Sequence, residues 1–233
     1  MASLSLRSSE VSGVLFRKNS SAHETKIQAW LASTIYRANI IALEVAREFS
    51  GITPEDIQSL VSLSLTPERI VELPEILARR HGIVLVIRPG YPSMKMDGCA
   101  LMLPSGNPMI GLSLRYNRYD NFWFTLVHEL SHICLHLEHL DNPIIDDLDE
   151  AAGDDIEIEA NSLARESFVP RREWRILYEK RYDEALLSRV CEQIGTHPDI
   201  VAGLIRYAAN NYKLYPSHHR AIDLKSILGF KDA

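Results

Sequence analysis

The sequence predicts an α+β fold in which one small antiparallel sheet is set between groups of helices. Apolar residues recur at helical spacing over residues 22–49 and again through most of the chain after residue 120. Between these stretches lie three short apolar runs, separated by proline and glycine. Because the helical and strand patterns occupy separate stretches and do not alternate, the fold class is α+β rather than α/β.

Glycine and proline delimit the helices expected before the sheet. The first helix covers residues 22–49 and ends before Gly51. Thr66 followed by Pro67 is typical of a helix start, because the first helical turn does not use the backbone N–H that proline lacks. We expect this second helix to end before Gly82.

Three strands and a long helix follow. Aliphatic residues dominate the expected strands at 83–88, 98–103 and 109–114, and the last two are predicted to form a hairpin. A helical pattern covers residues 121–139. An acidic stretch then holds seven Asp or Glu and no Lys or Arg, at residues 141–155. Helical patterns return after it, at residues 156–168, 171–194 and 198–211.

Composition excludes several classes of protein. The 233 residues are 46% hydrophobic and 24% charged, which is typical of a globular domain. A net charge of −6 disfavours nucleic acid as the main ligand. No apolar segment has the length of a signal peptide core or a membrane span, and three widely spaced cysteines argue against a disulfide framework. We therefore expect a cytoplasmic protein that contacts neither nucleic acid nor membrane.

Three parts are expected along the chain. Residues 1–20 are Ser-rich and weakly patterned, so they are predicted to form a flexible arm. Residues 21–170 are predicted to form the core of the domain, with helices at its start. Residues 171–233 are predicted to form a helical subdomain that packs on this core.

The motif that points to chemistry is His128-Glu129-Leu130-Ser131-His132. Residues four apart lie on one face of a helix, so both imidazole rings can reach one metal ion. Glu129 flanks that site without binding the metal and can take a proton from a water molecule there. Two histidines and a glutamate on a largely apolar helix are costly to bury unless a metal compensates them. The motif therefore predicts a zinc site, with manganese as an alternative metal.

A catalytic zinc ion requires a third protein ligand from another segment. The predicted helix at 156–168 has an apolar stripe that begins at Ile156, and Glu159 points along this stripe. Glu159 is therefore the expected third ligand, with Glu166 as the second choice. Each residue turns a helix by about 100°, so Glu157, the residue after Ile156, points about 100° away from the stripe, and we expect it to face solvent.

Two segments resemble the ImmA/IrrE family of metallo-endopeptidases. They are FTLVHELSHICLH, at residues 124–136, and EIEANSLARESFVP, at residues 157–170. A third segment, IGTHPDIVAGLIRY at residues 194–207, resembles a stretch of family members in which the peptidase follows a repressor-type DNA-binding domain. Ser131 departs from the glycine usual in the family, and Phe168-Val169 departs from Leu-Met, but neither departure removes a ligand.

The resemblance implies a zincin-like peptidase domain of the gluzincin type. It implies His128, His132 and Glu159 as zinc ligands and Glu129 as the catalytic base. It also implies a protein substrate, a helix-turn-helix transcriptional repressor, whose cleavage relieves repression in a response to DNA damage, stress, phage or a mobile element. LFRKNS, at residues 15–20, resembles the junction after the DNA-binding domain, so we expect the peptidase without that domain.

Two further residues near the motif are candidates for supporting roles. His136 continues the four-residue series, but it lies about 6 Å along the helix from His132, so we expect it to support the ligands rather than bind the metal. Cys99 lies in the predicted hairpin and is a candidate inhibitory fourth ligand, because zinc favours sulfur. The alternative is that Cys99 is a small buried core residue.

Two other functions remain open from the sequence. One is an antitoxin-like or regulatory interaction protein that keeps the zinc fold but does not cut. The other is a DNA-binding regulator, because residues 192–207 resemble a helix-turn-helix; against it, Arg206 is the one clear cation of that stretch, and phosphate contacts require Lys or Arg.

Overall fold

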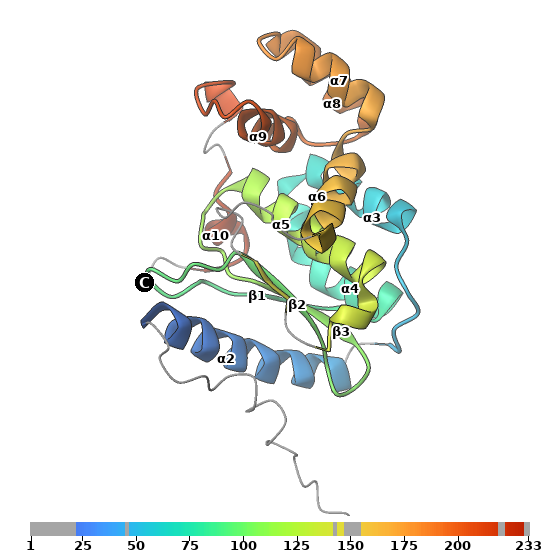
Figure 1. Ribbon diagram of the computed structural model, residues 1–233, viewed down its shortest axis with the longest axis vertical. Helices are drawn as coiled ribbons and strands as arrows, with labels where there is room; N and C mark the ends of the chain where they lie inside the picture. Colours follow the sequence, from blue (N-terminus) through green and yellow to red (C-terminus); the bar gives the residue numbers. More distant parts are fainter. Residues whose placement is uncertain (1–21, 45–46, 142–143, 147–154, 219–221, 231–233) are drawn as a thin grey trace, which may run out of the picture.

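The structure is a computed structural model and describes residues 22–44, 47–141, 144–146, 155–218 and 222–230. The expected arm at 1–20 lies outside these residues. An α+β, zincin-like architecture is present, as predicted, with helices on both faces of one small sheet (Figure 1). In the described part of the chain, no helix has both the length and the apolar character required to cross a membrane.

The sheet is mixed, so the prediction of an antiparallel sheet is wrong in one pairing. Its order is β1-β3-β2-β4, with β1 at Val84–Ile87, β2 at Gly98–Met102, β3 at Pro108–Leu112 and β4 at Ile144–Asp146. The hairpin of β2 and β3 is antiparallel, and β4 is antiparallel to β2. β1 pairs with β3 in parallel, on the edge of β3 that the hairpin leaves open.

Two layers of core cover the two faces of this sheet. Helix α2, Ala22–Glu44, lies on one face and buries Trp30 and Leu31. Helix α5, Tyr119–Leu135, lies on the other face (Figure 1). Side chains alternate between faces along each strand, so Val84 packs with α2 and Leu85 packs with α5.

Short helices complete the layer on the α5 side. α3, Pro54–Val61, starts with a capping box in which Thr53 and Asp56 satisfy each other's backbone N–H groups. The helix expected from Pro67 starts as a 3-10 segment and becomes α4 at Leu73–His81. α4 ends at Gly82, whose φ of 71° is left-handed and where a Cβ would lie 2.6 Å from the Arg47 carbonyl oxygen.

The remaining helices follow the acidic stretch. α6, Asp155–Phe168, packs along α5, and α9, Pro198–Ala208, packs against α5 as well. The pattern at 171–194 divides into α7, Arg171–Glu179, and α8, Glu184–Ile194, because the side chain of Asp183 caps a new helix. A short α10 at Leu224–Ile227 is the last helix of the described residues. The expected domain boundary at residue 170 stays a prediction, although Ile200 and Ile205 of α9 share one core with α5.

Candidate metal centre

Helix α5 brings the two motif histidines together in the interior. His128 and His132 are one turn apart, and both are fully buried. Their Nε2 atoms lie 3.0 Å from each other, with the ring planes almost perpendicular. The sequence folds this way because Leu126, Val127 and Leu130 anchor the same helix in the core.

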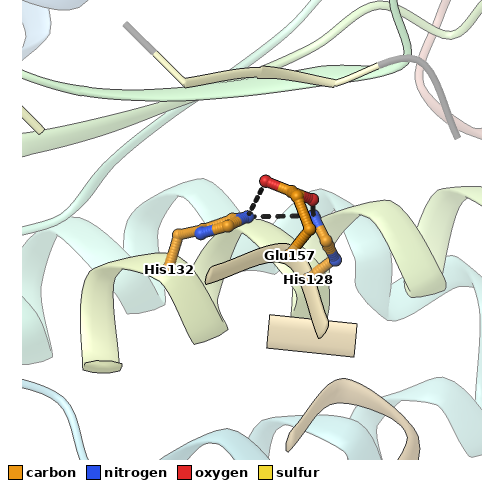
Figure 2. A group of neighbouring side chains, drawn as sticks. All are labelled: His128, His132 and Glu157. Carbon is orange, nitrogen blue, oxygen red and sulfur yellow. Dashed lines mark hydrogen bonds and ion pairs between the residues drawn. The ribbon is translucent and has the colours of Figure 1, made fainter. Parts of the chain in front are cut away.

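The third member of the cluster comes from α6. The carboxylate oxygens of Glu157 lie 3.3 Å from the Nε2 atom of His128 and 3.3 Å from that of His132 (Figure 2). One donor atom from each of the three residues lies within 4.8 Å of the other two. Because α6 packs along α5, the first turn of α6 places this carboxylate directly over the two imidazole rings.

These three donors fit a zinc ion. In a tetrahedral zinc site with bonds of about 2.0–2.1 Å, neighbouring ligand atoms lie about 3.3 Å apart. The two Nε2 atoms lie 3.0 Å apart, and each lies 3.3 Å from one oxygen of the Glu157 carboxylate, Oε2 for His128 and Oε1 for His132, so the carboxylate faces both nitrogens at about that spacing. Two imidazole nitrogens and one carboxylate oxygen also form the donor set of catalytic zinc sites that keep a fourth position open.

The electrostatics of the cluster favour an ionised acid. Hydrogen bonds from the imidazole rings of His128 and His132 hold the pKa of Glu157 far below its usual range, although partial burial opposes this shift. Glu157 is therefore a carboxylate at neutral pH, which is the form that binds a divalent cation.

The expectation that Glu159 lies beside the two histidines is wrong, and Glu157 occupies that place. The face of α6 that turns toward α5 carries the partly buried Glu157 and the buried Ala160 and Ala164, at spacings of three and four residues. Ile156, taken in the sequence as the start of the apolar stripe, is only partly buried. Two residues turn a helix by about 200°, so Glu159 points away, with a side chain that is 65% exposed.

The other carboxylate of α6 considered from the sequence also has a different partner. Glu166 pairs with Arg171, with 2.6 Å between a carboxylate oxygen and the guanidinium Nε atom. It therefore lies outside the cluster of His128, His132 and Glu157.

His136 lies next to the cluster and not in it. Its ring centroid is 5.6 Å from that of His132, and its side chain is almost fully buried. Its Nε2 atom lies 2.9 Å from a carboxylate oxygen of Glu159. His136 therefore lies between Glu159 and the ring of a donor histidine, and its supporting role stays a prediction.

Glu129 is fully buried on the side of α5 that faces the sheet. Its carboxylate lies against Gly98 in β2, so close that a Cβ atom at Gly98 would overlap it. Thr125, one turn earlier on α5, contacts the same point of β2. A small recess of about 10 Å³ lies beside Thr125, with a lining formed by Asp97, Leu112, Leu114, Arg115, Tyr116, Asn121, Phe122 and Thr125.

The prediction that Cys99 could act as a fourth ligand is wrong in this structure. Neighbouring residues of a strand point to opposite faces, and Gly98 faces α5. The Cys99 side chain therefore faces α2, where it is fully buried beside Trp30 and Gly111. The sheet itself separates this thiol from the two histidines. The alternative, a buried core residue, describes Cys99.

Residues 192–207, which were considered as a DNA-binding segment, have their one clear cation buried in the protein. α8 and α9 are two helices joined by a short turn at Gly195. Arg206, however, is only 1% exposed and binds Asp120 of α5, with 2.9 Å between the guanidinium and the carboxylate. A side chain held in this way cannot contact phosphate, so α9 is a packing helix of the core.

Comparison with known proteins agrees with this geometry. No curated protein matches the chain. A family model described as the IrrE N-terminal-like domain, Peptidase M78, matches residues 78–195, which is just over half of the chain. The match runs from the end of α4 to α8 and contains the sheet, both motif histidines and Glu157. The chain therefore belongs to the Peptidase M78 family, a family of metallopeptidases with an IrrE N-terminal-like domain.

Proposed function

We propose that this chain is a zinc-dependent endopeptidase that cleaves a protein substrate, a helix-turn-helix transcriptional repressor. One observation supports it most strongly. Two imidazole nitrogens and a carboxylate oxygen converge inside the protein, on the helix that also carries Glu129. A buried base next to three metal donors is the arrangement that metal-assisted hydrolysis requires.

His128, His132 and Glu157 would hold the metal. Nitrogen and carboxylate donors suit zinc, and manganese is the alternative because it accepts the same oxygen and nitrogen ligands. When bound, the metal supplies Lewis acidity, which lowers the pKa of a water molecule and polarises the scissile carbonyl group.

Glu129 performs the proton transfers. It follows His128 directly in the chain and is buried on the same helix, from where its carboxylate would act on a water molecule at the centre. A carboxylate oxygen accepts a proton from the attacking water and then donates it to the nitrogen of the leaving amine. One residue thus serves as base and then as acid, and the amide bond is broken by hydrolysis.

The substrate class follows from the resemblance to ImmA/IrrE peptidases and from charge. A net charge of −6 and a buried Arg206 favour a protein target over DNA. Cleavage of a repressor in the cytoplasm would release genes that respond to DNA damage, stress, phage or a mobile element. The repressor's own DNA-binding domain then provides the contact with DNA, and the peptidase needs none.

Replacing Glu129 with Gln tests the proposal. The purified zinc-loaded chain is incubated with helix-turn-helix repressors encoded beside it in the genome, and cleavage is followed by mass spectrometry. Loss of a general base typically costs about 10²–10⁴-fold in rate, and we expect the Glu129→Gln variant to lose that much while its zinc content is unchanged. Glu138→Gln is the matched control, because the Glu138 side chain is 73% exposed outside the cluster.

The competing function is a non-catalytic, antitoxin-like or regulatory interaction protein. Binding alone does not need a base, so a Glu129→Gln variant of such a protein would still relieve repression in cells. Equal relief by the wild-type chain and this variant would therefore overturn the enzyme proposal in favour of the interaction protein.

A further inference from the structure

Strand β2 contacts the proposed base at one residue, Gly98. This glycine is buried and pairs with Leu112 of β3 on one side and with Asp146 of β4 on the other. A Cβ added to it would lie 2.6 Å from the Thr125 methyl carbon and 3.0 Å from the Glu129 carboxyl carbon, and it would overlap a Glu129 oxygen. The space that a side chain would fill is thus the space of the carboxylate.

The backbone does not explain why glycine stands there. Gly98 lies within a regular strand, and its φ is outside the left-handed region, so any residue could adopt its conformation. Glycine also weakens a strand interior, because it loses more conformational freedom on folding than other residues do. The close approach of another group is the remaining physical reason for a glycine at this point.

We propose that Gly98 is a positioning residue: by leaving its face of β2 empty, it sets where the Glu129 carboxylate stands relative to the two histidines. This inference rests on the proposed function, in which Glu129 is the base. Two neighbouring strands fix the Gly98 backbone, so it forms a rigid wall behind a long, otherwise rotatable side chain. Burial of Glu129 leaves the carboxylate little other room.

Gly98→Ala is the first variant of the test. The added methyl group must displace the end of Glu129, because β2 is held on both sides by hydrogen-bonded strands. A misplacement of about 1 Å costs on the order of 100-fold in rate, and we expect a fall of that size in kcat with KM unchanged. Zinc affinity should not change, since His128, His132 and Glu157 come from α5 and α6.

Gly111→Ala is the matched control. Gly111 lies in β3, and a Cβ there would be 2.9 Å from the Cys99 sulfur, on the α2 side of the sheet. It therefore introduces similar crowding into the same sheet, but away from Glu129. We expect Gly111→Ala to lower the unfolding midpoint and to leave kcat within about twofold, because overpacking alone acts on stability.

A double-mutant cycle with Glu129→Asp distinguishes positioning from general damage. Asp is one methylene shorter, so its carboxylate withdraws from the added methyl group. If Gly98 positions the base, Glu129→Asp lowers kcat less in the Gly98→Ala background than in the wild-type background. Independent losses that simply multiply would overturn the proposal, because they mean that the two residues do not interact.

The crystal structure of Gly98→Ala gives a readout that does not depend on activity. A Glu129 carboxylate displaced from its wild-type position supports the inference, and an unmoved carboxylate overturns it. If the zinc-loaded wild-type chain cleaves no repressor, the proposed function fails, and this structure still decides whether Gly98 positions Glu129.

Discussion

Helix α5 carries two buried groups of polar side chains that tolerate burial in different ways. Near its start, Asp120 binds Arg118 at 2.5 Å and Arg206 at 2.9 Å. Two turns later, His128 and His132 converge with Glu157. The first group neutralises its charges with side chains of the opposite sign, whereas the second gathers the donors of a metal ion. One helix therefore carries an ion-paired group near its start and, in its middle, a group of donor atoms whose arrangement fits a metal ion.

The pKa of Asp120 reflects this internal pairing. Burial raises the pKa of the carboxyl group, but Arg118 and Arg206 more than offset burial and leave it below the usual value. Arg206 also donates to the backbone carbonyl oxygens of Tyr215 and His218, which ties α9 and the following segment to α5. Side chains of the protein itself thus neutralise the charges of this group, and its loss should act on folding and not on metal binding.

The largest expected effect is on stability, from Asp120→Ala. The variant leaves Arg206 buried without its carboxylate, and breaking a buried pair in this way costs about 3–5 kcal/mol. Urea unfolding should show this loss equally with zinc and with a chelator. Glu75→Ala is the control, because Glu75 belongs to an exposed pair with Arg79 and such pairs contribute about 0–1 kcal/mol. If Asp120→Ala lowered the free energy of unfolding only in the presence of zinc, the pair of Asp120 and Arg206 would not be independent of the cluster of His128, His132 and Glu157.

The same variant has a predicted pH dependence. A carboxyl group whose folded pKa is depressed contributes stability that is complete above its unfolded pKa, about 3.9 for Asp, and is lost as pH falls through the folded pKa. The difference in unfolding free energy between wild type and Asp120→Ala should therefore be constant from neutral pH to about pH 4–5 and should shrink in more acidic solution. A difference that grows on acidification would contradict the assigned direction of the Asp120 pKa.

The second effect concerns metal affinity and compares two acids of α6. Glu157→Gln removes a donor, and since outer partners of metal ligands already contribute about 10–100-fold, we expect more than about 100-fold weaker zinc binding. Glu159→Gln is the matched control two residues away, and we expect a change below about tenfold, through His136 alone. Competition with a chromogenic chelator at neutral pH measures both. Equal losses of zinc affinity in the two variants would show that the direction in which Glu157 points does not determine which acid of α6 binds zinc.

This pair of acids shows how far the sequence predicts the site. The spacing of His128 and His132 identifies two donors by itself, because helical geometry fixes residues four apart. The third donor depends on which face of α6 turns inward, and a shift of two residues reverses that choice. Ala160 and Ala164 are small residues that allow α6 to approach α5 closely. Their spacing from Glu157 is the sequence feature that could have placed Glu157 on the inner face.

The sequence predicts the positions of the strands better than it predicts how the strands pair. Apolar runs located β1, β2 and β3 to within about two residues of the boundaries in the structure, since strand composition is a local property. The parallel pairing of β1 with β3, and the addition of β4 after the motif helix, depend on contacts between distant segments. The buried pair of Asp120 and Arg206 joins residues that are 86 positions apart in the sequence, and no local sequence pattern predicts it.

The smallest expected effect concerns the two faces of β2. Cys99→Ala removes one buried heavy atom from the α2 side, and we expect a loss of about 1 kcal/mol in the free energy of unfolding, as for other small core deletions. Cleavage by the zinc-loaded variant should stay within about twofold of wild type, because the sheet lies between this residue and Glu129. The measurement is a cleavage rate beside a urea curve. A variant with clearly higher basal cleavage and unchanged zinc content would mean that the Cys99 thiol reaches the metal centre. That contact would require the two faces of β2 to be exchanged in solution, so that Cys99 faces α5. Since reversing the faces of β2 would also remove Gly98 from Glu129, the same result would undermine the positioning role of Gly98, so the two sides of this strand are tested together.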